Sequence, residues 1–417
     1  YGGQAPTSVA DTALSTFVQL LGAICSAVIF GNVAVLISSF DAQYAQYRGR
    51  MDAVNDFVMK VDGTPEYAVI SDGLAGTTHY VIDADALTIE QGDGDGTLVI
   101  DLDADAFARQ SVRRDPQLPA LLGFAPERVW PEIIRNKLGL DLANSFLIAG
   151  AHVPSALPDP QVLAWHYSTD RAPQYCREAR FLRDAINNIT VSYRRLCPEN
   201  GSDHTDSALV RFDCPESVRY TPGRLLSQEF IDLIGSDGWS TESAGAFVRH
   251  YATTLETLSQ EEGDTRKITS ITDRLPGKFL DVIPQNIILR DVNTPVIIDN
   301  EWCLTMDVEF GHCVLRALLL LMASITRFGV PSNGRTYTRQ EFIEEVFATS
   351  GFGITALDVR RYVTLEADIQ AQITGRLRDE FLDWSPDDLL MTQSSFSLTS
   401  ELERLRALAA AQRTEVQ

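Results

Sequence analysis

An uncharged apolar stretch opens the chain. No Asp, Glu, Lys or Arg occurs from residue 12 to residue 40, and the run Phe17–Ile37 is long enough to cross a hydrocarbon core, which needs ~20 residues. Asp11 precedes this run, whereas Arg48 and Arg50 follow it, which favours a cytoplasmic location for the C-terminal side. We therefore predict a single transmembrane helix over residues 13–37 in the inner (cytoplasmic) membrane. The alternative is a buried core helix.

Shorter apolar runs follow in residues 66–150. Alternating segments at Tyr67–Ile70, Thr78–Ile82 and Thr97–Leu102 are separated by Gly and Asp, which is typical of hairpin strands. Two helices are predicted next, one ending with the amphipathic run from Ala125 to Ile134 and one over Leu138–Ile148. The first part of the chain beyond the apolar run is thus expected to be rich in strands.

The period of the pattern changes again after residue 170. Arg177–Leu182 and Ile189–Arg194 alternate as antiparallel strands do. Long helices are expected over Ala244–Leu258 and within residues 339–375, and a helical tail over Leu402–Ala410. The apolar run Leu315–Met322 is short and contains an arginine, so we predict a core helix there and not a second membrane span.

Three polar residues stand beside two of the short apolar strands. Asp281 precedes Asn286 by five residues on a turn that contains Pro284, and two apolar strands then lead to Asp299. Kinase-type phosphotransferases need a carboxylate that orients the attacking hydroxyl, and an Asn and an Asp that hold magnesium under the phosphates. We therefore predict Asp281 as the catalytic residue, Asn286, Asp299 and Glu301 as magnesium ligands, and ATP as the nucleotide.

This D-x-x-P-x-N segment followed by I-D resembles the corresponding segment of small-molecule kinases such as aminoglycoside and choline kinases. His and Gly precede the first Asp in those enzymes, whereas Phe279 and Leu280 do so here. Kinases also place a Lys on a strand to hold the α- and β-phosphates. Arg194 stands at the end of the strand Ile189–Arg194, so it is the candidate phosphate-binding residue, with an ordinary solvated arginine as the alternative. No Gly-rich loop precedes it.

Charge and cysteine content narrow the class of protein. The 417-residue chain is 45% hydrophobic and 22% charged, which is typical of a globular protein. Its net charge of −22 argues against nucleic acid as a partner, because phosphate contacts need a basic surface. The six cysteines show no metal-binding spacing and fit a reducing compartment.

A second set of motifs is spread over residues 115–375. They are Asn136–Phe146, Tyr167–Asp170, Tyr175-Cys176, Tyr220–Gly223, Asp281 to Asn286, and Ile298–Trp302. Together they resemble the kinase-like C-terminal region of bacterial methyltransferases and glycosyltransferases of surface-polysaccharide synthesis. This resemblance implies a two-lobed kinase-like fold and a small-molecule or glycan acceptor. No strand followed by a Gly-rich turn and a helix occurs, so we expect no methyltransferase domain in this chain.

The first 60 residues have a different resemblance. Tyr1-Gly-Gly3, the apolar helix ending in Ile29–Val33, and the segment Gln43–Met59 resemble the end of the pore loop, the last pore-lining helix and the linker start of cyclic-nucleotide-gated and voltage-gated potassium channels. A selectivity filter needs rings of backbone carbonyls, and most of the filter is missing from this sequence. The chain alone is therefore not expected to conduct, although its apolar helix is a candidate oligomer contact.

The expected organisation is an α+β chain in five parts. Residues 1–62 are the transmembrane and juxtamembrane helices, and residues 63–114 a β-rich segment. Residues 115–225 are a small lobe with leading helices, residues 226–375 a helical lobe with the catalytic-loop-like motif, and residues 376–417 a helical tail. The leading functional hypothesis is a membrane-anchored kinase-like phosphotransferase linked to surface-polysaccharide synthesis. The alternatives are an inactive kinase-like interaction module and the cytoplasmic part of a truncated potassium-channel-like protein.

Overall fold

The structure is a computed structural model. It describes residues 66–71, 80–83, 103, 107, 109, 124–136, 138, 146–151, 161–168, 170–197, 208–261, 263, 267–290 and 294–392. The chain divides into two compact units, one of residues 1–67 with 150–157 and one of residues 68–149 with 158–417. All elements below belong to the second unit, apart from the end residues of strands β1 and β3.

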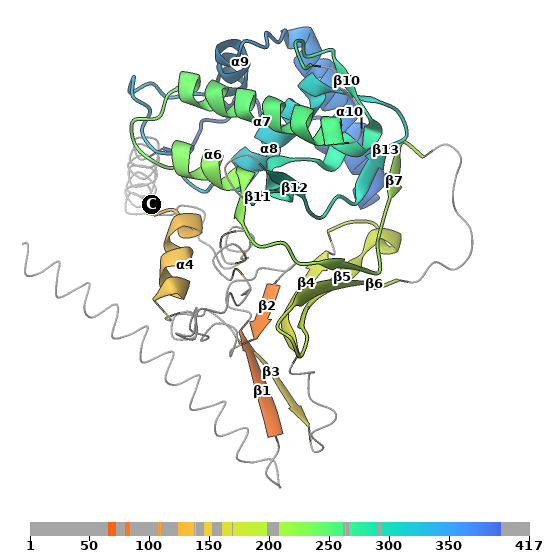
Figure 1. Ribbon diagram of the computed structural model, residues 1–417. Helices are drawn as coiled ribbons and strands as arrows, with labels where there is room; N and C mark the ends of the chain where they lie inside the picture. Colours follow the sequence, from red (N-terminus) through yellow and green to blue (C-terminus); the bar gives the residue numbers. More distant parts are fainter. Residues whose placement is uncertain are drawn as a thin grey trace, which may run out of the picture. The chain divides into compact units, whose positions relative to one another are not determined.

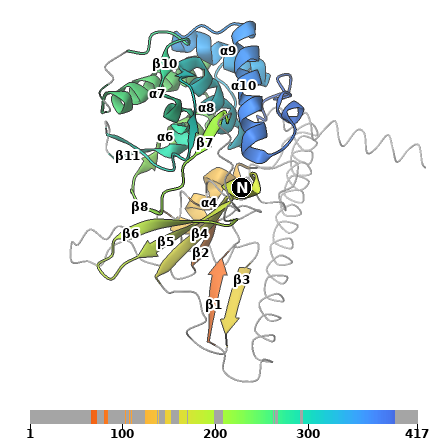
Figure 2. The ribbon, with the colours of Figure 1, turned by 90° about the vertical axis from the view of Figure 1, so that its right-hand side faces the viewer.

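One sheet dominates the N-terminal half of this unit, and its strands run in the order β3-β1-β2-β4-β5-β6-β8 (Figures 1 and 2). The strands are β1 (Glu66–Ser71), β2 (Tyr80–Asp83), β3 (Phe146–Ala151), β4 (Val162–Ser168), β5 (Arg177–Arg183), β6 (Ile189–Arg195) and β8 (Ser217–Arg219). Helix α4 (Pro126–Arg135) precedes β3 in the chain. The pairing of β5 with β6 is antiparallel and runs without a break from Arg177 opposite Arg195 to Arg183 opposite Ile189.

The two faces of this sheet differ because side chains alternate along a strand. On one face Phe181, Val191 and Ala179 are buried in a small apolar cluster with Ile134 of α4. Arg177 lies on the same face, two residues before Ala179. Glu178, Arg180 and Arg194 lie on the opposite face. The assignment of each charged residue to a face decides which of them can reach the polar residues described below.

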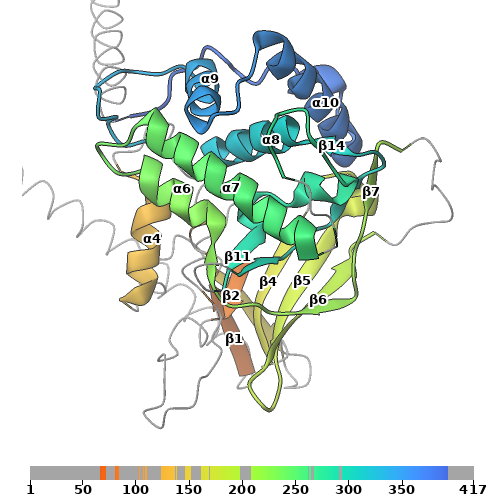
Figure 3. The same ribbon diagram turned by 45° about the horizontal axis from the view of Figure 1, so that its top comes forward.

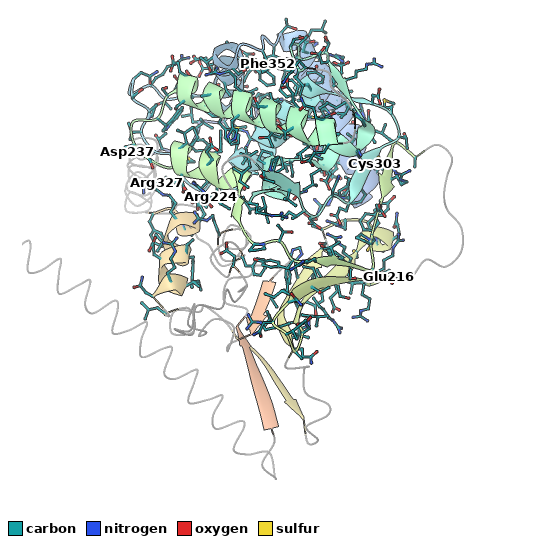
Figure 4. All side chains as sticks on the ribbon, in the orientation of Figure 1. Glu216, Arg224, Asp237, Cys303, Arg327 and Phe352 are labelled. Atoms are coloured by element: carbon teal, nitrogen blue, oxygen red, sulfur yellow. The ribbon has the colours of Figure 1, made fainter. Side chains whose placement is uncertain are left out.

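Helices make up most of the C-terminal half, where Figures 1 and 3 show α6 and α7 side by side with α8 behind them. The helices are α6 (Leu226–Ile234), α7 (Thr241–Glu261), α8 (Phe310–Ala323), α9 (Arg339–Ser350) and α10 (Ala356–Thr374). Arg224 and Asp237, labelled in Figure 4, precede and follow α6. One large apolar core joins these helices, and it includes Phe230, Phe247, Leu315, Phe342 and Tyr362.

The described residues also form short strands and short 3-10 helices. The strands are β7 (Val210–Phe212), β9 (Arg224–Leu225), β10 (Arg274–Leu275), β11 (Ile287–Leu289), β12 (Pro295–Ile297), β13 (Trp302–Leu304) and β14 (Val308–Glu309). The 3-10 turns are η3 (Pro173–Tyr175), η4 (Gly277–Asp281), η5 (Pro284–Asn286) and η6 (Arg378–Phe381). Strand β11 pairs antiparallel with both β12 and β9.

Local sequence signals fix the last two long helices. Thr338 and Thr355 each accept a hydrogen bond from a backbone N–H in the first turn, and Glu341 and Asp358 complete capping boxes by accepting from the cap residues. Helix α9 ends at Gly351, which adopts the left-handed conformation that glycine tolerates best. The predicted helical region 339–375 is thus confirmed as two helices.

Most other expectations for the described residues are confirmed as well. The chain is mixed α+β, the strands expected at Arg177–Leu182 and Ile189–Arg194 are β5 and β6, and the core helix expected at Leu315–Met322 lies within α8. The helix expected over Leu138–Ile148 is wrong at its end, because Phe146 begins strand β3. A short apolar run such as Phe-Leu-Ile has no periodicity that distinguishes a strand from a buried helix.

The helices within the described ranges include none that is both long and apolar enough to cross a membrane. The predicted span at residues 13–37 lies outside those ranges, as do the expected strand Thr97–Leu102 and the helical tail Leu402–Ala410. These three remain predictions.

At Gly277 the backbone of η4 lies close to the backbone at the end of β13, and a substitution can test this closeness. A Cβ at this position would lie 2.1 Å from the backbone oxygen of Leu304 and 2.5 Å from that of Met306. Backbone atoms cannot move aside as a flexible side chain can, so we expect Gly277→Ala to lower the free energy of unfolding by about 1–3 kcal/mol or more. Gly353→Ala is the control, since its Cβ would meet nothing within 4 Å. Urea unfolding of both variants checks this, and equal midpoints would contradict it.

Candidate functional site

The hairpin β11–β12 brings the three predicted polar residues together. Asp281 ends η4, Asn286 ends η5, and Asp299 follows β12. The side-chain Nδ2 of Asn286 donates to the backbone oxygen of Asp281 at 3.0 Å and to that of Asp299 at 3.3 Å. The backbone N–H of Ile298 donates to the oxygen of Asn286 at 2.8 Å, which closes the base of the hairpin. The short hairpin expected from the sequence is therefore confirmed.

Asp299 has an unusual backbone. Its φ is 53°, in the left-handed region, which non-glycine residues occupy at some energetic cost and which Asp tolerates better than most. Its side chain is 39% exposed and accepts a hydrogen bond from Arg177. Burial of the site would raise the pKa of Asp299, but the positive charge of Arg177 outweighs this effect and lowers the pKa. Asp299 is therefore ionised at neutral pH.

Arg177 is the cation at the centre of the site. Its side chain is only 2% exposed, and its Nη2 contacts both the Oδ1 of Asp299 and the Oε2 of Glu301, the latter at 2.9 Å. The guanidinium carbon lies 4.3 Å from the centre of the Tyr193 ring, a cation–π distance. Burial alone would lower the pKa of Arg177, but the two carboxylates, with Asp299 first, raise it.

Glu301 is shared by two arginines. Its Oε1 lies 2.8 Å from the Nη2 of Arg171 and accepts from the indole N–H of Trp302 at 3.2 Å. The guanidinium of Arg171 in turn lies 5.4 Å from the centre of the Trp302 ring. Burial raises the pKa of Glu301, and the negative charge of Asp299 adds to the rise. The carboxylate of Glu301 is 7% exposed, and Arg171 and Arg177 balance its charge within the chain.

Asp281 points inward in this structure. The residue is 4% exposed, and its Oδ2 accepts from the backbone N–H groups of Glu301 at 3.0 Å and Trp302 at 3.3 Å. Its Oδ1 lies 3.9 Å from Nη2 of Arg316. Burial raises the pKa of Asp281 to about 8, and the nearby charge of Arg316 only partly opposes the rise. Burial therefore favours the neutral, protonated form of this carboxyl.

A chain of buried polar groups continues behind Asp281. Arg316 of α8 donates to Glu366 of α10, and the other carboxylate oxygen of Glu366 lies 3.1 Å from Nε2 of His312. The Nε2 of Gln370 also donates to Glu366 at 2.7 Å. Burial would raise the pKa of Glu366, but Arg316 and then His312 outweigh it and lower the pKa to about 2. Glu366 thus balances the charge of Arg316 in the apolar core.

Arg194 does not reach these carboxylates. It lies on the face of the sheet opposite Arg177, its side chain is 64% exposed, and it contacts Glu178 at 3.3 Å. Glu178 also accepts from the Nε of Arg180 at 2.6 Å. The predicted phosphate-binding arginine therefore pairs with the buried carboxylate of Glu178 on the opposite face of the sheet from Arg177, because a one-residue step along β6 reverses the direction of a side chain.

The predicted magnesium ligands have suitable chemistry. Carboxylate and amide oxygens are the ligands that Mg²⁺ prefers, and Asn286 uses its Nδ2 for backbone contacts, which leaves its oxygen as the atom able to bind a cation. Asp299 and Glu301, however, are both ion-paired with Arg177 in this conformation. Within the described residues, no three His, Cys, Asp or Glu side chains are arranged to hold a metal ion. The site thus offers oxygen atoms that suit Mg²⁺. The ion would have to compete with Arg177 for the carboxylates of Asp299 and Glu301.

Sequence reasoning missed Arg171, Arg177, Arg316 and Glu366. In the sequence, Arg177 is the first residue of a predicted strand. Arg316 is the single charged residue inside a predicted apolar helix. A charge at such a position needs a buried partner, so Arg316 could have been flagged from the pattern alone. Arg171 and Glu366 gave no comparable signal.

The chain matches no protein-family model, no curated protein and no solved structure. No relative therefore supplies a function, and the contacts described above are the grounds for proposing one.

The contribution of the buried Glu366 carboxylate to the free energy of unfolding should depend on pH. Removing one partner of a buried ion pair leaves the other charge unbalanced, so we expect Glu366→Gln to lower the free energy of unfolding at pH 7 by about 3–5 kcal/mol. A carboxyl whose pKa is lowered on folding stabilises the native state fully above its ordinary value of 4.5, and that stabilisation is lost as the pH falls towards 2. The gap between the natural chain and the variant should therefore narrow below pH 4.5.

Asp368→Asn is the matched control, because Asp368 lies on the same helix in an exposed pair with Arg378, both side chains being 42% exposed. An exposed pair contributes about 0–1 kcal/mol, so this variant should unfold nearly as the natural chain does. Urea unfolding at several pH values measures both variants. If both variants lost the same free energy of unfolding at pH 7, the buried pair would stabilise the chain no more than the exposed pair does.

Proposed function

We propose that the chain is a kinase-like phosphotransferase that uses ATP and magnesium to phosphorylate a hydroxyl group. The main support is the closeness of Asp281, Asn286 and Asp299, because the amide of Asn286 donates to the backbone oxygens of both aspartates. A carboxylate, an amide and a second carboxylate on adjoining turns are the groups that phosphoryl transfer needs. The left-handed backbone of Asp299 adds support, because strained residues cluster at functional sites.

Each residue then has a separate role. Asn286 and Asp299 would hold Mg²⁺, with Glu301 beside them, and the ion when bound would neutralise charge on the phosphates. Arg177 and Arg171 are the cations nearest these carboxylates, so they are better placed than Arg194 to face phosphate oxygens. Asp281 would orient the acceptor hydroxyl.

The role of Asp281 requires a change of conformation. Its carboxylate is turned toward backbone N–H groups and is 4% exposed, so it cannot contact an acceptor as it stands. Catalytic hydrogen bonds are often incomplete without the substrate and form in the productive complex. We infer that substrate binding rotates this side chain outward and away from Glu301.

The second candidate is an inactive kinase-like interaction module. The inward Asp281 and the ion pair of Arg177 with Asp299 favour it, because both carboxylates are satisfied without a ligand. The two candidates differ in one property: only the first requires the site to bind nucleotide with magnesium.

The cellular setting follows from the resemblances in the sequence. We propose that the N-terminal apolar run anchors the chain in the inner membrane, that residues 115–375 face the cytoplasm, and that the acceptor is a glycan of surface-polysaccharide synthesis or a related small molecule. The channel-like alternative depends on residues 1–60, and it predicts no response of the site to nucleotide.

Nucleotide binding is tested by the melting temperature of the full chain. ATP with Mg²⁺ should raise it, because a ligand at about 100 times its Kd stabilises the native state by about 2.7 kcal/mol. Asp299→Asn should abolish the rise, whereas Asp307→Asn should keep it, since Asp307 is an exposed acid eight residues further along the chain. Differential scanning calorimetry gives the readout. An unchanged melting temperature of the natural chain at millimolar ATP and Mg²⁺ would favour the inactive module.

Transfer is tested separately at Asp281. Asp281→Asn should keep the nucleotide-dependent rise in melting temperature but lower phosphate release from ATP, with water as the acceptor, by about 10²–10⁴-fold, the usual contribution of an acid–base group. Release of labelled phosphate under single-turnover conditions measures this. Equal rates in the natural chain and the variant would remove Asp281 from the reaction.

A further inference from the structure

A single nitrogen of Arg177 occupies the space between two carboxylates. Its Nη2 contacts Asp299 on one side and Glu301 on the other, and these two residues belong to the loop that joins β12 to β13. A divalent cation bound by both carboxylates would need the same place. The guanidinium is held there from a different element, the first position of β5, with Tyr193 against its face.

The local charges already cancel. Arg177 and Arg171 face Asp299 and Glu301, so two positive groups balance two negative ones. An arginine side chain does not lose its proton in proteins, so its charge cannot be removed to make room for an ion. A divalent ion added to this group would therefore meet an uncancelled guanidinium a few ångströms away.

We propose that Arg177 is an internal counter-cation that excludes divalent metal from Asp299 and Glu301 until a polyphosphate group arrives to bind the guanidinium. The metal then enters only as part of a complex with nucleotide, and free Mg²⁺ does not load the site. This order rests on the proposed function for the identity of the polyphosphate, but the exclusion itself depends only on Arg177 and the two carboxylates.

The unsatisfied atoms of the site agree with this mode of binding. The Nε of Arg177 is buried and has no hydrogen-bond partner, and neither has the Oε2 of Glu301 under strict geometry, although it lies 2.9 Å from the guanidinium. The arginine thus neutralises the carboxylates by charge without using all of its donors. A phosphate oxygen would supply the missing acceptor once the guanidinium, whose side chain is 2% exposed, turns outward.

Manganese serves as the probe for the exclusion, measured by equilibrium dialysis of the full chain without nucleotide. The natural chain should show no Mn²⁺ binding that depends on Asp299. Arg177→Gln should gain Mn²⁺ binding, with a Kd about tenfold or more below the weakest that the dialysis detects, because one positive charge close to the ion is removed. Arg177→Gln combined with Asp299→Asn should lose the gained site. Tight Mn²⁺ binding by the natural chain that Asp299→Asn abolishes would overturn the proposal.

Two further variants distinguish the loss of the positive charge at residue 177 from a general disruption of the site. Arg194→Gln removes an arginine of the same sheet that lies on its opposite face, 64% exposed, and should leave Mn²⁺ binding as in the natural chain. Arg177→Lys keeps a positive charge and should still exclude the ion. If Arg177→Gln folds only when Mn²⁺ is present, that metal-dependent melting transition is itself the expected gain. If Arg177→Lys binds Mn²⁺ as tightly as Arg177→Gln, the charge is not what excludes the ion and the proposal is wrong.

Binding of ATP in the absence of metal tests whether Arg177 is the phosphate ligand. ATP in the presence of EDTA should raise the melting temperature of the natural chain, since the guanidinium is then the phosphate ligand, and Arg177→Gln should lose most of this rise. A natural chain that binds no nucleotide at all would end the proposed function. A gain of Mn²⁺ binding in Arg177→Gln would still establish the exclusion in that case.

Discussion

The ion pair between Arg177 and Asp299 joins the antiparallel sheet to the hairpin region, and much of the site depends on it. Arg177 is fixed at the start of β5, whereas Asp299 is fixed by the hairpin β11–β12 and by its left-handed backbone. A buried guanidinium is costly unless a carboxylate neutralises it. The carboxylates that the sequence predicts as metal ligands are thus also the groups that balance the charge of a buried arginine. The same atoms serve folding and, in our proposal, ligand binding.

A second buried network supports the site from behind. Arg316 lies between Glu366, to which it donates, and Asp281, whose carboxyl oxygen is 3.9 Å away. Burial raises the pKa of Asp281, and the charge of Arg316 opposes this rise without cancelling it. Arg316, held in place by Glu366, therefore lowers the pKa that burial alone would give Asp281. These two residues belong to helices α8 and α10, so the surroundings of Asp281 depend on how these helices pack.

The sequence was sufficient to predict the local geometry around the three polar residues. A turn with Pro284, two short apolar strands and the intervals between Asp281, Asn286 and Asp299 are consecutive features, and a hairpin can join them in few ways. The amphipathic and apolar helices could also be predicted, because their periods extend over ten or more residues. The strand β3 could not, since three apolar residues fit a helix as well as a strand.

The sequence pattern alone does not predict which arginine contacts Asp299. Both Arg177 and Arg194 lie on strands that the sequence predicts, and both look equally suited to a phosphate. Which of them faces Asp299 depends on the face of the sheet that covers the hairpin, and that is a property of the packed structure. Phe181 and Val191 decide it, because they are buried on one face and so place Arg177 on the same side and Arg194 on the other. Which arginine contacts the carboxylates thus depends on which face of the sheet is apolar and buried.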